Sequence, residues 1–567
     1  MKKNRFKRWM AILLAGIMAL SMVACAPSEK NDSENTGNTG NTGTTEPGNK
    51  GDEGTETASK VVFPLEKEVT FEIMVAYDGD IEAAVAAVPF MEELYKMTNV
   101  KIKWTALPKD VAVSSLNNLL IAGSAGDAIL GRWVSETELI NMASAGHIAA
   151  LDEYISNPEL MPNFTERVVN EDAKYLASIT TPDGHVYALP NINKLDGNFL
   201  ENPIWINQEW LKAVNMPVPT TVEELEKVLI AFRDSDCNGN GKTDDEVPLI
   251  FMDGHDFSHM EALLSMWGIA TKDSAKDHYV DIENGVVEFV PVTETYKTAI
   301  KTLNKWYKEG LIWSECFTAT KQSFSAKLDD GSGVSTVGVV FTKTPPSTFK
   351  DQYVRVKPIA AEGYEAEWLR NAGYLGGKGN FSILSNCENK KILAHWIDLF
   401  YSFENTIQLA FGEEGDNWEY NAEGKVIQNS TKLSGDEKTE MLKKVFSRIP
   451  GNIPSAYTAK DYAERIQISG NNLTLQENYE DYKNVMSDEF WPRPYMSEEN
   501  ASRLGVLRTD ISTTVKMYKA NWVAGVSDID KEWDKYIKSL NAMGLEEYIK
   551  ILQNSYDVFN EALKNVK

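Results

Sequence analysis

The sequence predicts an α/β protein of two lobes with added helices. With 567 residues, the chain is longer than one hydrophobic core usually organises. Strand and helix patterns alternate where its apolar part begins: Glu68–Ala76 has the pattern of a buried strand, 90–100 of a helix and 100–108 of a second strand. This strand-helix-strand order indicates a parallel sheet covered by helices.

Amphipathic helices are predicted in three later stretches. Thr221 and Glu224 have the spacing of a capping box at the start of one helix. A second helix is expected in the stretch TETYKTAIKTLNKWYKEGLI, 293–312, with Gly310 ending it, and the tail after about Asp510 is expected to be helical too. The residues expected to face the core are Val222, Leu225, Val228, Leu229, Phe232, Tyr296, Ile300, Leu303, Trp306, Tyr307, Trp396, Ile529, Trp533, Ile537 and Leu540.

The N-terminus has the pattern of a processing signal. Basic residues precede an apolar run, 9–23, that is short for a membrane span and ends in SMVAC. Small residues before a cysteine resemble a bacterial lipobox, so 1–24 is expected to be a signal peptide and Cys25 to carry lipid. Met22 leaves an ordinary secretory signal as the alternative. Residues 25–60 lack aromatic and large aliphatic side chains and are expected to form a disordered tether.

The net charge of the chain argues against nucleic acid and anionic lipid surfaces as partners. The chain has 57 basic and 83 acidic residues, a net charge of -26, which repels nucleic acid and anionic lipid headgroups. We therefore expect no nucleic-acid partner, and membrane contact through the lipid anchor only.

Cys237, Cys316 and Cys387 show no CxxC spacing, so three buried or inert thiols are expected, with one disulfide as the alternative.

Several stretches, taken in order, carry a resemblance to a known family. They are GHVYALP, IWINQEWLKAVNMPVPTTVEELEKVLIAF, an oxygen-rich loop at 234–248, YKTAIKTLNKWYKEGLI and WDKYIKSLNAMGLEEYIKI. Their order and spacing resemble the extracellular solute-binding lipoproteins of bacterial ABC importers, of the family 1 oligosaccharide-binding type. The resemblance implies a periplasmic-binding-protein, or Venus-flytrap, fold with an oligosaccharide in its cleft and ABC permease subunits as partners.

The same resemblance implies where the protein is located and how its chain is divided between the two lobes. A monomer anchored on the outer face of the bacterial cell membrane is expected. One lobe is expected to hold residues 61–185 plus about 375–440, and the other about 186–374 plus 441–567.

The loop DSDCNGNGKTDDEVP, Asp234–Pro248, has the donors that calcium prefers, since Ca²⁺ takes six to eight hard oxygen ligands. An EF-hand register from Asp234 leaves Asp where position 12 should be Glu. A second register resembles a calcium loop of this family and implies a structural Ca²⁺, with either Asp245 or Glu246 closing the shell. A solvated acidic turn is the alternative. The implied ligands are Asp236, Asn238, Asn240, the Lys242 carbonyl, Asp244 and Asp245.

An oligosaccharide ligand makes aromatic residues the candidates for its binding site. Pyranose rings have apolar faces that stack on Trp and Tyr, while polar side chains bond their hydroxyls. Aromatic residues outside helical core patterns are therefore the candidates, with core packing as the alternative for each. Several have polar neighbours in sequence, including Asp78 and Asp80, Arg132 and Arg370. The candidates are Tyr77, Trp133, Tyr187, Trp205, Trp368, Tyr374 and Trp491.

Catalytic motifs are absent from the sequence. HDFSH, His255–His259, has the histidine spacing of a zinc protease but Asp where the general base Glu belongs. No pair of carboxylates stands out as glycosidase machinery. A binding protein is thus expected and no enzyme, with a tethered carbohydrate-active enzyme or a ligand-sensing lipoprotein as alternatives.

Overall fold

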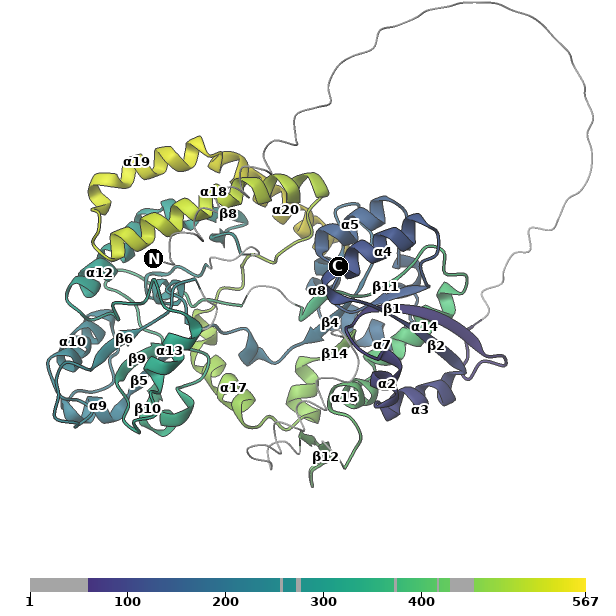
Figure 1. Ribbon diagram of the computed structural model, residues 1–567, viewed down its shortest axis with the longest axis horizontal. Helices are drawn as coiled ribbons and strands as arrows, with labels where there is room; N and C mark the ends of the chain where they lie inside the picture. The colour runs from purple at the N-terminus through teal and green to yellow at the C-terminus, as the bar shows by residue number, and fades with distance from the viewer. Residues whose placement is uncertain are drawn as a thin grey trace, which may run out of the picture. The chain divides into compact units, whose positions relative to one another are not determined.

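A six-stranded sheet forms the centre of one lobe, which we call lobe 1 (Figure 1). The computed structural model describes residues 60–254, 258–271, 277–371, 375–415, 418–428 and 453–566. In strand order β14-β4-β11-β3-β1-β2, the pairs β14·β4, β3·β1 and β1·β2 are parallel and those of β11 are antiparallel. The strands are β1 Val69–Ala76, β2 Val100–Leu107, β3 Ala128–Leu130, β4 Leu189–Asn193, β11 Gly377–Ile383 and β14 Ser455–Tyr457.

The predicted strand-helix-strand unit is confirmed. β1 pairs in parallel with β2 over its whole length, from Val69 opposite Val100 to Ala76 opposite Leu107. The connecting helix α3, Pro89–Thr98, starts with proline, whose fixed φ suits a first helical turn, and ends at Asn99 in the left-handed conformation. Its apolar face buries Phe90 and Leu94 against the sheet side of the lobe.

Short helices cover the sheet of lobe 1, as Figure 1 shows in purple, blue and green. Two of them, η2 and η9, are π-helical turns, a rare conformation. A two-stranded hairpin, β12 Trp418–Tyr420 with β13 Val426–Gln428, follows α15. The helical segments are α2 Ile81–Ala86, η1 Lys109–Val111, α4 Ala112–Ile121, α5 Glu136–Ser144, α6 Asp152–Ile155, α7 Pro162–Phe164, η2 Thr165–Val169, α8 Ala173–Ile179, α14 Lys390–Asp398, η7 Leu399–Tyr401, α15 Phe403–Phe411 and η9 Asp461–Arg465.

A four-stranded sheet and a larger hydrophobic core form lobe 2. Its order is β10-β5-β9-β6, with β6 and β9 parallel and the other pairs antiparallel. The hairpin of β7 Val280–Glu283 and β8 Val286–Phe289 packs on the same core. The sheet strands are β5 Ile204–Asn207, β6 Val247–Ile250, β9 Val337–Phe341 and β10 Tyr353–Arg355.

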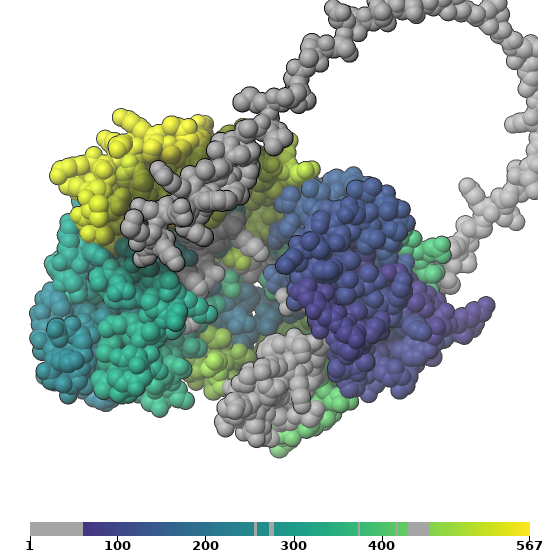
Figure 2. Space-filling model, viewed as in Figure 1, coloured from purple at the N-terminus to yellow at the C-terminus, as the bar shows by residue number. Residues whose placement is uncertain are grey.

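Long helices near the C-terminus cover lobe 2. Figure 2 shows them as a yellow surface beside the teal surface of the lobe, where α18 and α12 are in contact. The helical segments are η3 Asp196–Asn198, α9 Gln208–Ala213, α10 Val222–Arg233, α11 Glu261–Leu264, η4 Ser265–Trp267, η5 Val290–Val292, α12 Glu294–Lys308, α13 Lys321–Leu328, η6 Ser347–Gln352, α17 Asn471–Tyr482, η10 Lys483–Val485, α18 Glu498–Val523, α19 Ile529–Ala542 and α20 Leu545–Val566.

The predicted amphipathic helices are confirmed, with two differences of detail. The Thr221 hydroxyl accepts a hydrogen bond from the Glu224 N–H, but the Glu224 carboxylate returns the bond to the N–H of Thr220 rather than to Thr221. On α12, Tyr307 is only half-buried because it lies beside the exposed end of the helix, near Gly310 at φ 72°. The predicted core tryptophans Trp306, Trp396 and Trp533 are all buried.

The chain passes between the two sheets after β4, after β10 and after β14. The predicted division of the chain needs correction at two strands: β4, 189–193, and β14, 455–457, were expected in the second lobe but pair within the sheet of lobe 1. Two of the passages pack on each other, since a Cβ on Gly197 would lie 2.4 Å from the carbonyl carbon of Leu475 in α17. Only glycine permits that approach.

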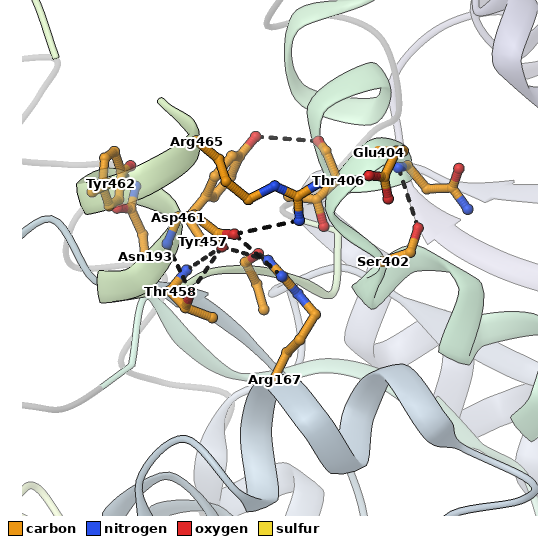
Figure 3. Close-up of polar contacts among 12 residues, drawn as sticks. Arg167, Asn193, Ser402, Glu404, Thr406, Tyr457, Thr458, Asp461, Tyr462 and Arg465 are labelled. Atoms are coloured by element: carbon orange, nitrogen blue, oxygen red, sulfur yellow. Dashed lines mark hydrogen bonds and ion pairs between the residues drawn. The ribbon is translucent and has the colours of Figure 1, made fainter. Parts of the chain in front are cut away.

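A buried ion pair fixes the segment that leaves lobe 1 after β14 (Figure 3). Arg167 in the π-helical turn η2 donates to Asp461 in the π-helical turn η9, with 2.5 Å between Nη2 and Oδ2. The Asp461 carboxylate also accepts from the backbone N–H and hydroxyl of Thr458. Arg465 extends the network to Glu404 of α15, at 2.6 Å. Because both charges are buried and bonded on several sides, this segment has one strongly favoured position.

Helix α20 belongs to both hydrophobic cores. Its first half places Tyr548, Leu552 and Tyr556 in the core of lobe 2, whereas Phe559 lies in the core of lobe 1. The helix is accordingly in contact with both β8 and α8. One continuous helix therefore ties the lobes together in addition to the three passages of the chain.

Candidate functional site

Three loops meet at one edge of the sheet of lobe 1. Because β1 is parallel to both β2 and β3, the carboxyl ends of these strands lie on the same edge, where ligands bind in open α/β sheets. Tyr77 follows β1, Lys109 follows β2 and Arg132 follows β3. The Lys109 ammonium lies 5.9 Å from the ring centre of Tyr77, and its backbone N–H donates to Asp78 at 2.8 Å. Two of the predicted stretches, those of Tyr77 and Trp133, therefore reach this edge.

Trp133 and Tyr187 lie in a small core cluster of lobe 1 around α5. The half-buried Trp133 indole donates to the Leu130 carbonyl at 2.9 Å, and the buried Tyr187 hydroxyl donates to Asp183 at 3.0 Å. Burial, together with the Asp183 carboxylate, raises the pKa of Tyr187 to about 12. Both side chains thus have structural partners.

A pocket of about 510 Å³ lies between α5 of lobe 1 and α18 of lobe 2, and we call it the α5–α18 pocket. Its volume is within the range of small-ligand sites, about 300–1,000 Å³. The walls come from α5, β11, the segment 491–496, His278 and the first turns of α18. Its polar and aromatic lining includes Arg132, Ser135, Glu136, Lys378, His278, Trp491, Arg493, Tyr495 and Arg508.

Lys378 connects three walls of this pocket. Its ammonium lies 3.2 Å from Glu136 of α5, donates to the carbonyl of Arg493 and lies 4.6 Å from the ring centre of Tyr495. A cation over an aromatic face is attracted by the ring quadrupole. Lys378 therefore holds α5, β11 and the segment 491–496 at fixed distances.

The segment 491–496 is held from the other side by Arg493. Its guanidinium makes two parallel hydrogen bonds to Asp277, with Nε–Oδ1 2.7 Å and Nη2–Oδ2 2.9 Å. Such two-point pairs fix orientation as well as distance. Arg493 is partly exposed and lines the pocket, whereas its partner Asp277 is buried behind it and lines the neighbouring small cavity.

Backbone strain concentrates at this wall. His278, Tyr279 and Arg493 have φ of 63°, 59° and 52°, in the left-handed region that side chains other than glycine rarely adopt. Residues in that region cluster at binding sites, where the surrounding structure holds them. Gly377 leaves room for Arg132 at this wall, since a Cβ at position 377 would lie 2.5 Å from the Arg132 Cδ.

Trp491 and His278 form the aromatic part of the wall. Their ring centres are 5.9 Å apart in an edge-to-face arrangement, and His278 Nδ1 lies 2.9 Å from the Tyr548 hydroxyl. Burial lowers the pKa of His278 to about 3, with the Arg508 and Arg493 charges acting in the same direction against Asp277. The imidazole is therefore neutral at neutral pH. Of the predicted aromatic residues that the structure describes, Trp491 is the one that lines this pocket.

Trp205 and Trp368 lie in hydrophobic cores instead. Trp205 of β5 donates to the Thr342 carbonyl, and the fully buried Trp368 donates to the Glu201 carbonyl, both at 2.9 Å. Their burial argues against contact with a ligand, because each indole already has its hydrogen-bond partner inside lobe 2. Tyr374 lies outside the described residues.

Sequence reasoning missed several polar and charged residues of the pocket. His278, Lys378 and Arg508 come from three distant stretches with no common motif, and only the fold brings them together. Arg132, by contrast, was named beside Trp133, and Arg493 stands in the same FWPRPY stretch as Trp491. An arginine between prolines, next to an aromatic residue, is the signal that could have found Arg493.

A second cavity holds two carboxyl groups with shifted pKa values. Burial raises the pKa of Asp281 to about 6 and that of Glu367, which also faces Asp281, to about 7. Raised carboxyl pKa values occur in glycosidases. The cavity that both line measures only about 20 Å³, room for a water molecule but not for a sugar ring. His259 is buried beside Glu261, and His255 of the same motif lies outside the described residues.

The oxygen-rich loop connects α10 to β6 and folds around Asp236. Its two carboxylate oxygens accept from the N–H groups of Asn240, at 3.1 Å, and Gly241, at 2.8 Å. Gly239 and Gly241 have φ of 73° and 84°, which allow these tight turns. The Asn240 amide donates to Asp245 at 2.7 Å. Among the described residues, no group of three or more His, Cys, Asp or Glu side chains is placed to hold a metal.

Two carboxylate oxygens at the end of this loop are buried without a hydrogen-bond donor. They are Oδ1 of Asp245 and Oε2 of Glu246. The second oxygen of Glu246 accepts from the Cys237 N–H at 3.0 Å, and burial raises the pKa of Glu246. Buried acceptors without donors are costly, and a hard cation satisfies them. The donor set therefore fits Ca²⁺, although the ligating atoms are not drawn into one cluster.

The remaining cysteines agree with the prediction of inert thiols. Cys237, Cys316 and Cys387 are free and buried, and burial raises the pKa of each. Cys25, the expected lipid site, lies outside the described residues together with the predicted signal peptide and most of the tether. In the part of the chain that the structure describes, no helix is long and apolar enough to cross a bilayer.

Comparison with known proteins gives relatives over most of the chain. No protein-family model matches the sequence. The fructooligosaccharide ABC transporter substrate-binding protein FusA of Streptococcus pneumoniae is 30% identical over 516 residues, 89% of this chain and 93% of FusA. Lipoprotein LipO of Bacillus subtilis is 24% identical over 316 residues, 55% of this chain and 52% of LipO.

Solved structures match the fold over the same range. FusA in complex with kestose covers 87% of this chain and 100% of its own, with a TM-score of 0.66 and 26% identity. A FusA EF-hand mutant in complex with fructo-nystose matches with the same values. An HMO-binding ABC-transporter-associated solute-binding protein from Bifidobacterium longum infantis has a TM-score of 0.73 and 25% identity, covering 87% of this chain and 99% of its own.

Proposed function

The chain belongs to the substrate-binding proteins of ABC transporters, and we propose that it captures an oligosaccharide outside the cell and delivers it to an importer. The α5–α18 pocket carries this proposal. One wall, with Glu136 and Lys378, belongs to lobe 1, and the other, with Trp491 and Arg508, belongs to lobe 2. The relatives FusA and the Bifidobacterium protein, named for binding sugars, support an oligosaccharide as the ligand.

Capture follows from contacts with both lobes. Aromatic faces such as that of Trp491 stack on sugar rings, and arginine, lysine and carboxylate groups bond sugar hydroxyls. A ligand that touches both walls binds the closed arrangement better than an open one, so it shifts the population toward closure. The permease subunits would then recognise the closed, liganded form.

Screening the full-length protein against an oligosaccharide library tests this function. We expect saturable binding of at least one oligosaccharide, with the ligand recovered intact after long incubation. We propose a binding protein and no enzyme, because the relatives are substrate-binding proteins and the raised carboxyl groups Asp281 and Glu367 line a cavity too small for a sugar. Hydrolysis of the bound sugar would overturn this and support a tethered carbohydrate-active enzyme.

We further propose that lipid on Cys25 anchors the protein to the outer face of the bacterial cell membrane. The lipobox-like SMVAC and the polar tether that follows support this, as does the lipoprotein LipO among the relatives. Cys25→Ala should release the protein from the membrane or block its processing, whereas Cys237→Ala should leave both unchanged. Full membrane retention of a correctly cleaved Cys25→Ala protein would contradict the anchor. The net charge of -26 supports a protein without nucleic-acid partners, and we expect a monomer.

A structural Ca²⁺ in the loop between α10 and β6 is also proposed. The EF-hand mutant made of FusA supports a calcium loop in a relative, and the buried oxygens of Asp245 and Glu246 without donors support one here. The ion would supply positive charge that offsets the repulsion between neighbouring carboxylates. Its ligands would be Asp236, Asn238, Asn240, the Lys242 carbonyl, Asp244 and either Asp245 or Glu246.

A further inference from the structure

Basic side chains dominate the lining of the α5–α18 pocket. Among the described residues that line it, Arg132, Lys378, Arg493 and Arg508 are basic and Glu136 is the one carboxylate. This is unusual for a chain whose net charge is -26. Electropositive clefts attract and orient anionic ligands.

Arg132 is the basic residue that is best placed to meet a ligand. It is exposed, and Nη1 donates to the backbone carbonyl of Gly376 at 2.5 Å. Within the described residues, Arg132 forms no ion pair, so its charge is not offset by a carboxylate. The side chain passes close to Gly377, where a Cβ would leave no room for it.

Two of these arginines act on His278, whose pKa is lowered first of all by burial. The Arg508 and Arg493 charges both favour the neutral imidazole, and Arg508 outweighs the opposing effect of Asp277. A second cation at that position is disfavoured, whereas an anion would be stabilised. Basic side chains thus line the pocket on both sides, Arg132 from lobe 1 and Arg508 from lobe 2.

We propose that this pocket recognises a carboxylate group on the bound oligosaccharide, so that the ligand is an acidic sugar chain such as one containing uronate residues. Guanidinium groups bind carboxylates through two parallel hydrogen bonds, and these charge-assisted bonds are stronger than those to neutral hydroxyls. Arg132 and Arg508 come from different lobes, so a carboxylate that engages both favours closure. Trp491 supplies an apolar face for the adjoining ring. The inference rests on the proposed function and names the class of its ligand.

Matched ligand pairs test the inference. The full-length protein is titrated with uronate-containing oligosaccharides and with the same chains after reduction of their carboxyl groups to alcohols. The acidic member of the preferred pair is expected to bind about tenfold more tightly or better. Raising the salt concentration should weaken the acidic member more than the neutral one, because salt screens charge interactions.

Two variants locate the effect. Arg132→Gln and Arg508→Gln should each lower the affinity for the acidic member by about tenfold and change that for the neutral member little. Arg503→Gln is the matched control: this arginine lies on the same helix, outside the pocket lining and half-exposed, and pairs with Glu547. It removes the same charge and should leave the preference unchanged. Thermal unfolding shows that each variant is folded.

The outcomes separate this inference from the proposed function. Equal or better binding of the reduced chains, or a preference that survives in both variants, overturns the inference. Tight binding of a neutral oligosaccharide with none of the acidic chains also overturns it, while supporting the proposed function. Failure of every oligosaccharide to bind overturns the proposed function, and the inference falls with it.

Discussion

Arg493 and Asp277 are joined by two hydrogen bonds of 2.7 and 2.9 Å, although the residue after Asp277 and Arg493 itself both have strained backbones. The pair thus holds two segments of lobe 2 in conformations that neither would adopt alone. One of these segments carries His278 and the other carries Trp491. This pair therefore helps to fix the segment 491–496, which Lys378 holds from the other side.

Replacing Asp277 with Asn should lower the free energy of unfolding by about 1–3 kcal/mol, because Arg493 loses its charged partner in a half-buried place. Urea unfolding measures the change. Glu547→Gln is the control: it breaks an exposed pair with Arg503, in which both side chains are 47% exposed, and should cost less than about 1 kcal/mol. Equal losses for the two variants would show that the Arg493–Asp277 pair has no special role.

Two tryptophans should respond differently to removal. Trp205→Ala should lower the free energy of unfolding by about 3–5 kcal/mol, since the indole is buried in lobe 2 and bonded to Thr342. The folded fraction should keep its ligand affinity. Trp491→Ala should weaken oligosaccharide binding by about 1–3 kcal/mol, by analogy with base-on-aromatic stacking. Melting curves measure the stability of both variants, and calorimetric titration measures their affinity for the oligosaccharide. A loss of affinity in Trp205→Ala alone would contradict the core role of Trp205 and the binding role of Trp491.

His278 should make stability depend on pH. Its pKa is about 3 in the folded protein and 6.5 ordinarily, so the unfolded chain takes up the proton first as the pH falls. The contribution of the neutral imidazole to the free energy of unfolding is fully present above about pH 6.5. As the pH falls from about 6.5 to 3, this contribution is lost by up to about 1.4 kcal/mol per pH unit.

The comparison of wild type with His278→Asn isolates this contribution, because asparagine tolerates the left-handed backbone but does not titrate. Melting curves at several pH values between 7 and 4 should fall more steeply for wild type than for the variant. Parallel curves would show that folding does not lower the pKa of His278, which would contradict this account.

Calcium should stabilise the fold through the loop after α10. Chelation should lower the melting temperature, and Ca²⁺ should restore it better than Mg²⁺, with about 2.7 kcal/mol gained when free Ca²⁺ exceeds its dissociation constant a hundredfold. Asp236→Ala should abolish the response. Asp530→Ala, which removes an exposed carboxylate paired with Lys301, should keep it. A chelator that leaves the melting curve of metal-analysed wild type in place would reduce the loop to a solvated turn.

Local patterns predicted elements better than they predicted the site. The spacing of Val222, Leu225 and Phe232 was enough for α10, because burial of one helix face is a local property of sequence. Loop aromatics gave a weaker signal: Trp491 lines the pocket, but Trp205 and Trp368 fill cores, since a tryptophan in a strand or loop satisfies its N–H equally well inside.

Pairing between segments far apart in the sequence accounts for the features that local patterns did not predict. β14, residues 455–457, joins lobe 1 beside β4, far away in the sequence, and three-residue strands carry too little pattern to be assigned. The pairing of β11 with β3 is also long-range, and it brings Lys378 of β11 close to Glu136 of α5, while Lys378 also donates to the carbonyl of Arg493. No stretch of sequence contains that contact, so the charged pocket emerges only with the fold.

Small-angle scattering with and without a ligand from the oligosaccharide screen tests the central claim most directly, which is capture between two lobes. The account predicts that a saturating oligosaccharide lowers the radius of gyration of the full-length protein, because contacts with walls from both lobes favour closure. Arg503→Gln, outside the pocket, should close as wild type does. An unchanged scattering curve under conditions where calorimetry shows the protein saturated with ligand would contradict it.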